Sequence, residues 1–144
     1  MTVFKDSLLN GTSLNGTDPK EFITGFYRAL NDDLINTEED AGLIIDRYHT
    51  PDIVQVADGH RMDRDKLVAH TRPVRKNRPA VRMEVHEALG EGDTLAARYT
   101  LHVRNPKRDL AIEVCFFGRF APDGRMREAN MLTRMLTGQE EAQA

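Results

Sequence analysis

The sequence has little cysteine, no tryptophan and no long apolar run. One cysteine in 144 residues, Cys115, excludes an internal disulfide framework and suits a reducing compartment. No stretch approaches the roughly 18 apolar residues of a membrane-spanning helix. Residues 1–17 lack the basic start and continuous apolar core of a secretion signal. We therefore expect a soluble, cytoplasmic protein.

Positive charge is not in excess either. The net charge of −3 argues against a general nucleic-acid binder. The densest basic stretch, Arg72–Arg82, lacks interleaved aromatic residues, so it is either a solvated loop or a site for a phosphate or an acidic partner.

The overall composition and length are typical of one globular domain. Hydrophobic residues make up 40% of the chain and charged residues 30%. The length lies within the usual single-domain range of about 100–200 residues. We expect residues 18–137 to fold as this domain, between flexible segments at 1–17 and 138–144.

Helical periodicity occupies the first half of the chain. Asp18 and Pro19 predict a helix start, and apolar residues then recur every fourth position at Phe22, Phe26, Leu30 and Leu34. Thr37 is the predicted cap of a second helix, which Pro51 stops. Asp63 opens a third helix, which Pro73 ends or kinks.

A period of two replaces the helical period from residue 81 onward. The alternation predicts a four-stranded antiparallel meander over 79–136, preceded by a short hairpin at 53–62. Helices followed by a meander indicate an α+β fold. The inward face of the last strand stays open. Either Glu128 and Asn130 face inward, or Arg127, Ala129, Met131 and Thr133 do.

Three local segments carry a resemblance to a known family. They are residues 26–31 (FYRALN), 48–52 (YHTPD) and 119–126 (RFAPDGRM), in that order. With the order of the predicted elements, they resemble the NTF2-like superfamily, in particular its SnoaL-like members. The resemblance implies a cone, with three N-terminal helices packed on a strongly curved, mainly antiparallel six-stranded sheet that encloses a mostly apolar pocket.

The resemblance also implies a function class and an assembly. Relatives are cofactor-free cyclases, isomerases, dehydratases and hydrolases acting on small apolar, polyketide-like or steroid-like molecules. They commonly form homodimers through the convex sheet face. In the predicted register Ala96, Cys115 and Phe117 lie on that face, where exposed apolar surface is costly.

The best-known chemistry of the family does not carry over. The polar positions of ketosteroid isomerases fall on Phe26, on Ala57 or Asp58, and on Phe116, and phenylalanine cannot donate to a developing oxyanion. The last strand has no aspartate where SnoaL-like cyclases carry one.

The candidate catalytic residues follow by elimination. Cys115 has no evident activating base, and no metal-ligand or phosphate-loop spacing stands out, so we expect neither metal nor cofactor. Histidine remains, as His60 or His70, with Asp58 to orient it. The alternatives are an ordinary polar hairpin around His60 and a structural histidine at position 70.

The candidate substrate-binding residues are mostly aromatic, and Tyr99 is the most probable pocket tyrosine because it lies on the apolar face of its strand. The full set is Phe26, Tyr27, Tyr48, Tyr99, Phe116 and Asn130. Three hypotheses remain open: an acid-base enzyme, a non-catalytic binder of a small apolar ligand, and a dimerisation module with a vestigial pocket.

Overall fold

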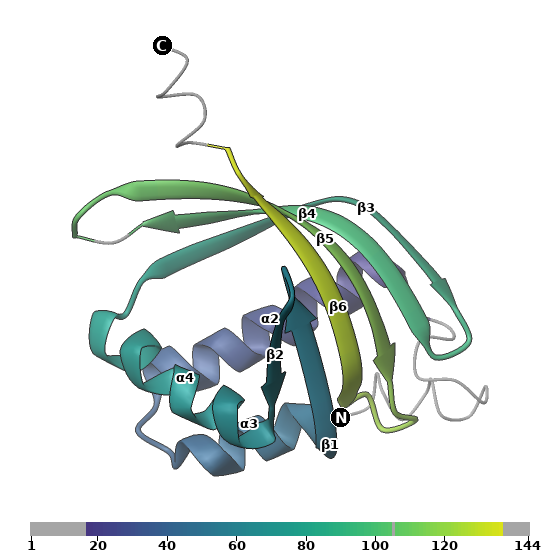
Figure 1. The fold of residues 1–144 in the computed structure, drawn as a ribbon, viewed down its shortest axis with the longest axis horizontal. Helices are drawn as coiled ribbons and strands as arrows, with labels where there is room; N and C mark the ends of the chain where they lie inside the picture. The colour runs from purple at the N-terminus through teal and green to yellow at the C-terminus, as the bar shows by residue number, and fades with distance from the viewer. Residues whose placement is uncertain (1–16, 105, 137–144) are drawn as a thin grey trace.

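The computed structural model describes residues 17–104 and 106–136, and they form an α+β cone (Figure 1). The predicted flexible segments lie outside the described residues, apart from Thr17. Three helices come from the first half of this region: α2 (Pro19–Asn36), α3 (Ala41–Tyr48) and α4 (Arg64–Asn77). None of the described helices has the length and apolar content needed to cross a membrane.

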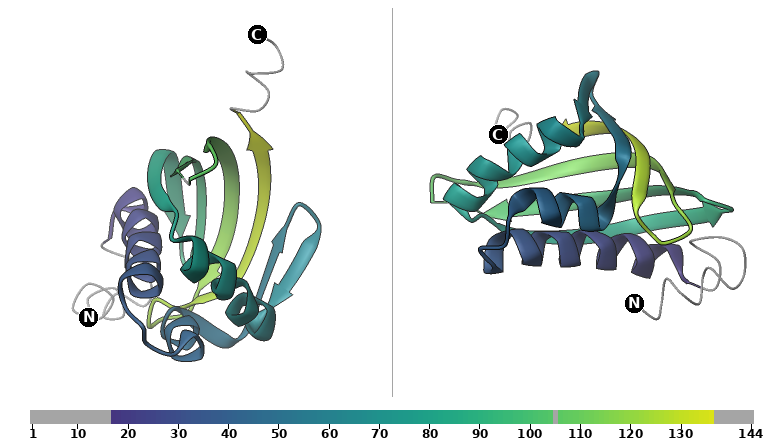
Figure 2. Two further views of the ribbon diagram at one scale, coloured as in Figure 1. Left: turned by 90° about the vertical axis from the view of Figure 1, so that its left-hand side faces the viewer. Right: turned by 90° about the horizontal axis from the view of Figure 1, so that it is seen from below.

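One sheet takes up the other elements of the described region. Its strands are β1 (His49–Ala57), β2 (His60–Asp63), β3 (Ala80–Glu91), β4 (Thr94–Arg104), β5 (Asp109–Phe120) and β6 (Met126–Met135). Their spatial order is β2-β1-β6-β5-β4-β3, and only the β1–β6 pair is parallel among the described pairs. Figure 2 shows the sheet bending around the helices, which cover its concave face. The predicted hairpin, meander and mainly antiparallel cone are confirmed.

The helix boundaries follow local capping. The Asp18 side chain accepts a hydrogen bond from the Glu21 amide at 3.2 Å, as predicted. The predicted second cap was wrong: Asp40, not Thr37, caps α3 by accepting from the Leu43 amide at 3.2 Å. The Thr37 hydroxyl instead donates to the Asp33 carbonyl at the end of α2.

Neither Pro51 nor Pro73 marks the end of a helix, and the alternative prediction for Pro73, a kink, stays a prediction. Pro51 does not stop a helix, because α3 ends at Tyr48 and the extended backbone of β1 already begins at His49. Helix α4 does not end at Pro73 but continues to Asn77, where Arg78 adopts a left-handed conformation and its amide bonds the Val74 carbonyl at 2.8 Å.

A bulge settles the inward face of β6. Met126 pairs with Phe120 and Glu128 pairs with Arg119, so Arg127 is an extra residue and the side-chain alternation shifts there. Ala129 is buried on the concave side, and Glu128 is exposed on the convex side. Met126 is also fully buried, which is why extrapolation from Met126 fails to predict the register.

Candidate binding cavity

A cavity of about 610 Å³ lies between α2 and the concave face of the sheet. Apolar side chains from β3 to β6 form its wall: Val81, Met83, Leu101, Ile112, Val114 and Met131. Its volume is within the usual range of about 300–1,000 Å³ for small-molecule pockets. The cavity is therefore open space that the protein's own side chains do not fill.

Two tyrosines interrupt the apolar wall. Tyr27 comes from α2 and Tyr99 from β4, and their ring centroids are 6.3 Å apart. Tyr99 is 2% exposed, and the two hydroxyls are hydrogen-bonded to each other. Burial raises the pKa of both phenols, so both stay protonated at neutral pH. We call these two residues the phenol pair.

The phenol pair is held by aromatic packing. Phe116 lies 6.4 Å from the ring of Tyr27 and 6.5 Å from that of Tyr99. Phe26 packs edge-to-face on Tyr27 at 5.2 Å and on Phe120 at 5.5 Å. These rings fix the positions of the two hydroxyls, because a close-packed aromatic cluster leaves little room for reorientation.

Other polar side chains reach the cavity from its rim. Helix α2 supplies Thr24, Arg28, Asn31 and Asp32, β1 supplies Gln55, and β6 supplies Thr133. The Thr133 amide donates to the Asp58 carboxylate at 2.8 Å, and its hydroxyl donates to the same carboxylate. These bonds hold the pKa of Asp58 below its ordinary value.

The predicted catalytic residues are not brought together in this cavity. His60 is exposed at the β1–β2 turn, and His70 is exposed on α4, where Leu67 and Thr71 take the buried side. His70 lines a separate depression next to Pro73. The expectation that these histidines face the cavity was wrong. Asp58 is hydrogen-bonded to Thr133, so it does not orient His60 toward the cavity either.

The predicted substrate-binding residues divide into three groups. Tyr27 and Tyr99 line the cavity, while Phe26 and Phe116 are buried behind it. Asn130 was misplaced, because the β6 bulge puts it on the convex face.

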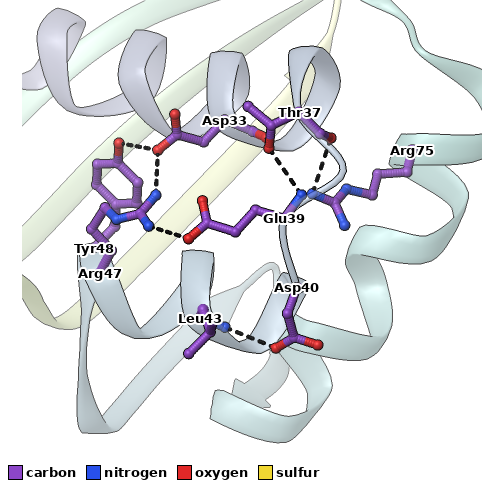
Figure 3. A network of polar contacts seen from close by, with 8 residues as sticks. All are labelled: Asp33, Thr37, Glu39, Asp40, Leu43, Arg47, Tyr48 and Arg75. Atoms are coloured by element: carbon purple, nitrogen blue, oxygen red, sulfur yellow. Dashed lines mark hydrogen bonds and ion pairs between the residues drawn. The ribbon is translucent and has the colours of Figure 1, made fainter.

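Tyr48 was misplaced as well. Its hydroxyl donates to the Asp33 carboxylate at 2.6 Å, in the network that joins α2 to α3 (Figure 3). The same carboxylate accepts from Arg47 at 2.9 Å. Tyr48 is thus part of a clamp between helices, and it is absent from the cavity lining.

Apart from Tyr27, the polar residues at the rim were not predicted from the sequence. Thr24, Tyr27, Arg28 and Asn31 are spaced by three, one and three residues, so they share one face of α2 beside the apolar stripe. That spacing could have identified them. Thr133 could not be assigned to the cavity from the sequence, because the inward face of the last strand was left open there. Among the described residues, no three His, Cys, Asp or Glu side chains are grouped so that they could hold a metal ion.

Fold and cavity together define a class, that of small cone-shaped α+β domains with a pocket between helix and sheet. Residues 23–129 match the family model of the SnoaL-like domain, so the chain belongs to the SnoaL-like family within the NTF2-like superfamily. A search of curated proteins found no match.

Solved structures share this fold. A protein from Shewanella denitrificans OS-217, provisionally named a SnoaL-like polyketide cyclase, is 17% identical with a TM-score of 0.64, over 87% of this chain and 96% of that one. An epoxide hydrolase from M. tuberculosis, described as LEH-like, is 15% identical with a TM-score of 0.59, over 78% and 83% of the two chains. At such identities the likeness concerns the fold.

Proposed function

We propose that the concave cavity binds a small, mainly apolar molecule and holds an acceptor oxygen of that molecule, such as a ketone, on the phenol pair. The observation that carries the proposal is the placement of Tyr27 and Tyr99 in an otherwise apolar wall. A ligand that buries its hydrocarbon body against β3–β6 gains hydrophobic stabilisation of about 25 cal/mol per Å².

The hydrogen-bonding capacity of the phenol pair supports an acceptor as the ligand group. Two phenols carry two O–H donors, and one donor is used in the bond between Tyr27 and Tyr99. The second O–H is left for a ligand. Because burial keeps both phenols protonated, the pair suits a carbonyl or ether oxygen and does not suit a cation.

Turnover of the bound molecule is a second candidate function, and the phenol pair is the observation that favours it. A buried donor aimed at a carbonyl oxygen stabilises negative charge that develops there. The phenols cannot act as the base at neutral pH, since their raised pKa keeps the proton in place. Asp32, exposed at the rim, is the carboxylate among the described lining residues.

A matched pair of probes tests the binding proposal. We expect 2-acetylnaphthalene to bind more tightly than 2-ethylnaphthalene, which has the same aromatic body without the oxygen. Tyr99→Phe should weaken ketone binding about 2- to 10-fold, the usual range for one hydrogen bond, and leave the hydrocarbon unaffected. Tyr48→Phe is the control, because Tyr48 is absent from the lining. Equal affinities for both probes in the wild type would contradict the proposal.

We also propose a homodimer through the convex face of the sheet. Leu89 is 76% exposed, Phe117 52% and Leu132 69%, and they come from β3, β5 and β6. Together with Ala96 and Cys115 they line a shallow depression of about 530 Å³, which we call the convex patch. Such a patch of exposed apolar side chains is typical of an interaction site.

Charges around the convex patch suit a second copy of the chain as the partner. Arg98 forms ion pairs with Glu87 at 2.9 Å and with Glu113 at 3.2 Å, so both signs border the patch. In a two-fold dimer the same surface meets itself, and a border of mixed sign avoids like-charge repulsion.

Sedimentation velocity at micromolar concentration tests the dimer. Leu132→Asp should raise the dimer dissociation constant at least about tenfold, because it places a charge in the centre of the contact. Leu43→Asp is the matched control, since Leu43 is 58% exposed on α3, away from the sheet. A wild-type monomer at micromolar concentration would rule the dimer out.

A cytoplasmic setting completes the proposal. The thiol of Cys115 is free and exposed, and such thiols persist best in a reducing compartment. Fractionation of cells that make the tagged chain checks this, and recovery of the chain outside the cytoplasm would contradict it.

A further inference from the structure

Thr133 lies on the concave side of β6 and lines the cavity. It follows Ala129 and Met131 in the side-chain alternation beyond the bulge. Across the sheet it pairs with Val114 on β5, and Val114 pairs with Tyr99 on β4. Neighbouring strands are about 4.8 Å apart, so the Cα atoms of Tyr99 and Thr133 are roughly 10 Å apart in one row of the cavity wall. One ligand can therefore reach both the phenol pair and Thr133.

The proton of the Thr133 hydroxyl has a fixed partner. The hydroxyl donates to one oxygen of the Asp58 carboxylate, and the Thr133 amide donates to the other at 2.8 Å. These bonds hold the pKa of Asp58 below its ordinary value, and an ionised carboxylate can only accept hydrogen bonds. Oγ1 of Thr133 therefore has lone pairs left but no proton to offer, so it can accept a hydrogen bond from a ligand and cannot donate one.

The two polar positions of this row have opposite hydrogen-bonding capacity. The phenol pair has one O–H left for a ligand, whereas Thr133 offers only an acceptor. The wall between them is apolar, since Val114 lies between Tyr99 and Thr133. A ligand that satisfies both positions must carry an acceptor at one end and a donor at the other.

We infer that the ligand of the cavity carries a hydroxyl group opposite its acceptor oxygen, and that this hydroxyl donates to Oγ1 of Thr133. The inference rests on the proposed binding function and adds the second polar end. Asp58 is a positioning residue, because it takes the threonine proton and so makes Thr133 an acceptor. Thr133 then favours a hydroxy ketone over the matching methoxy ketone, because an ether oxygen would meet the lone pairs of Oγ1.

Two further probes test the second polar end separately from the ketone. 6-Acetyl-2-naphthol keeps the ketone and rings of 2-acetylnaphthalene and adds a hydroxyl at their far end. 6-Methoxy-2-acetylnaphthalene carries a methyl group in place of that hydroxyl proton. In calorimetric titration at neutral pH, the naphthol should bind about 2- to 10-fold more tightly than 2-acetylnaphthalene, the range for one hydrogen bond. The methoxy ketone should show no such gain.

Variants of Thr133 identify the acceptor. Thr133→Val keeps the shape of the side chain and the backbone bond to Asp58 but removes the oxygen. It should abolish the gain of the naphthol and affect 2-acetylnaphthalene, which has no group to donate, far less. Thr133→Ser restores the hydroxyl and should restore the gain. Thr37→Val is the control, because it removes an exposed threonine hydroxyl outside the cavity lining and should change neither affinity.

A variant of Asp58 tests its positioning role. Glycine tolerates the left-handed backbone of Asp58, whose φ is 52°, so Asp58→Gly removes the carboxylate without adding strain. The Thr133 hydroxyl is then free to rotate and can donate to an ether oxygen. The preference for the naphthol over the methoxy ketone should therefore fall about 2- to 5-fold, whereas a purely structural role of Asp58 would weaken both ketones alike.

The outcomes separate this inference from the proposed function. If 2-acetylnaphthalene binds through Tyr99 and the naphthol gains nothing, the inference fails and the proposed function stands. The inference also fails if Thr133→Val leaves the gain of the naphthol intact, because another rim group, such as Gln55 or Asp32, then receives the hydroxyl. An unchanged preference in Asp58→Gly overturns the role of Asp58. If no ketone binds at all, both the proposed function and the inference are wrong.

Discussion

The two faces of the sheet are built from alternate residues of the same strands, yet they differ in what covers them. Phe116 on the concave face is 3% exposed and packs under the helices, whereas its neighbour Phe117 on the convex face is 52% exposed. Both are phenylalanines on β5. The difference teaches that the register of a strand, and not residue type, decides which aromatic side chain belongs to the core.

Truncation of these neighbours gives the largest expected contrast. Phe116→Ala should lower the free energy of unfolding by about 3–5 kcal/mol, because it leaves a cavity among Tyr27, Tyr99 and Phe120. Phe117→Ala should cost less than about 1 kcal/mol in the monomer, as expected for an exposed position. Urea unfolding in the Leu132→Asp background, where the proposed dimer is weakened, measures both. Equal losses would break the comparison between the two faces.

Much of the fold was predictable because its signals are local. The Asp18 cap, the four-residue stripe on α2 and the period-two strands depend only on neighbouring residues. The β6 register was not predictable, because the bulge at Arg127 arises from pairing with β5 across the hairpin. The predicted inward position of Asn130 was wrong for the same reason.

The residues of the candidate site were predictable only where they belong to the apolar face of a predicted strand or helix. Tyr99 was found because it lies on the same face of β4 as the apolar residues Leu95, Ala97 and Leu101. Arg28 was not named, although its spacing from Thr24 and Asn31 on α2 places the three residues on one face of the helix. The histidines were chosen for their chemistry, and sequence offers no measure of the direction in which an exposed side chain points.

Gly118 and Gly25 allow a packed position to be compared with an open one. A Cβ atom at Gly118 would lie 2.5 Å from Cζ of Phe116 and 3.3 Å from the Glu128 carbonyl oxygen. Gly118→Ala should therefore destabilise the protein by about 1–3 kcal/mol, since the Phe116 ring must shift. Gly25→Ala is the opposite case: apart from its chain neighbours and the backbone of its own helix, no atom lies within 4 Å of the added Cβ, and the change should stabilise α2 by up to about 1 kcal/mol. Thermal unfolding of the two variants checks the signs, and a stabilising Gly118→Ala would show that the ring is not confined.

The buried side chain of His49 should make the free energy of unfolding depend on pH. Its ring is 2% exposed, lies 5.9 Å from that of Phe26, and donates through Nδ1 to the Ile45 carbonyl at 2.8 Å. Burial lowers the pKa of His49, although the Ile45 bond and the charge of Asp46 partly oppose this. The folded protein therefore binds this proton less readily than the unfolded chain does.

The sign of the pH effect follows from that difference. The contribution of His49 to stability is complete above the ordinary histidine pKa of about 6.5 and declines as the pH falls below it. The decline is at most about 1.4 kcal/mol per pH unit for one proton. Chemical unfolding between pH 7.5 and about pH 5 should show this slope in the wild type and a flatter profile in His49→Gln. An unchanged profile would mean that His49 is protonated equally in both states.

The smallest expected effect separates two tyrosines that were both candidate substrate-binding residues. Tyr48→Phe should lower the free energy of unfolding by about 1 kcal/mol, because the Asp33 carboxylate loses one hydrogen bond but keeps its contact with Arg47. It should leave the affinity for 2-acetylnaphthalene unchanged, whereas Tyr99→Phe should lower that affinity. Urea unfolding and calorimetric titration of the two variants provide both values. If Tyr48→Phe weakened ketone binding as much as Tyr99→Phe does, the cavity would not be the binding site, because Tyr99 lines the cavity and Tyr48 does not.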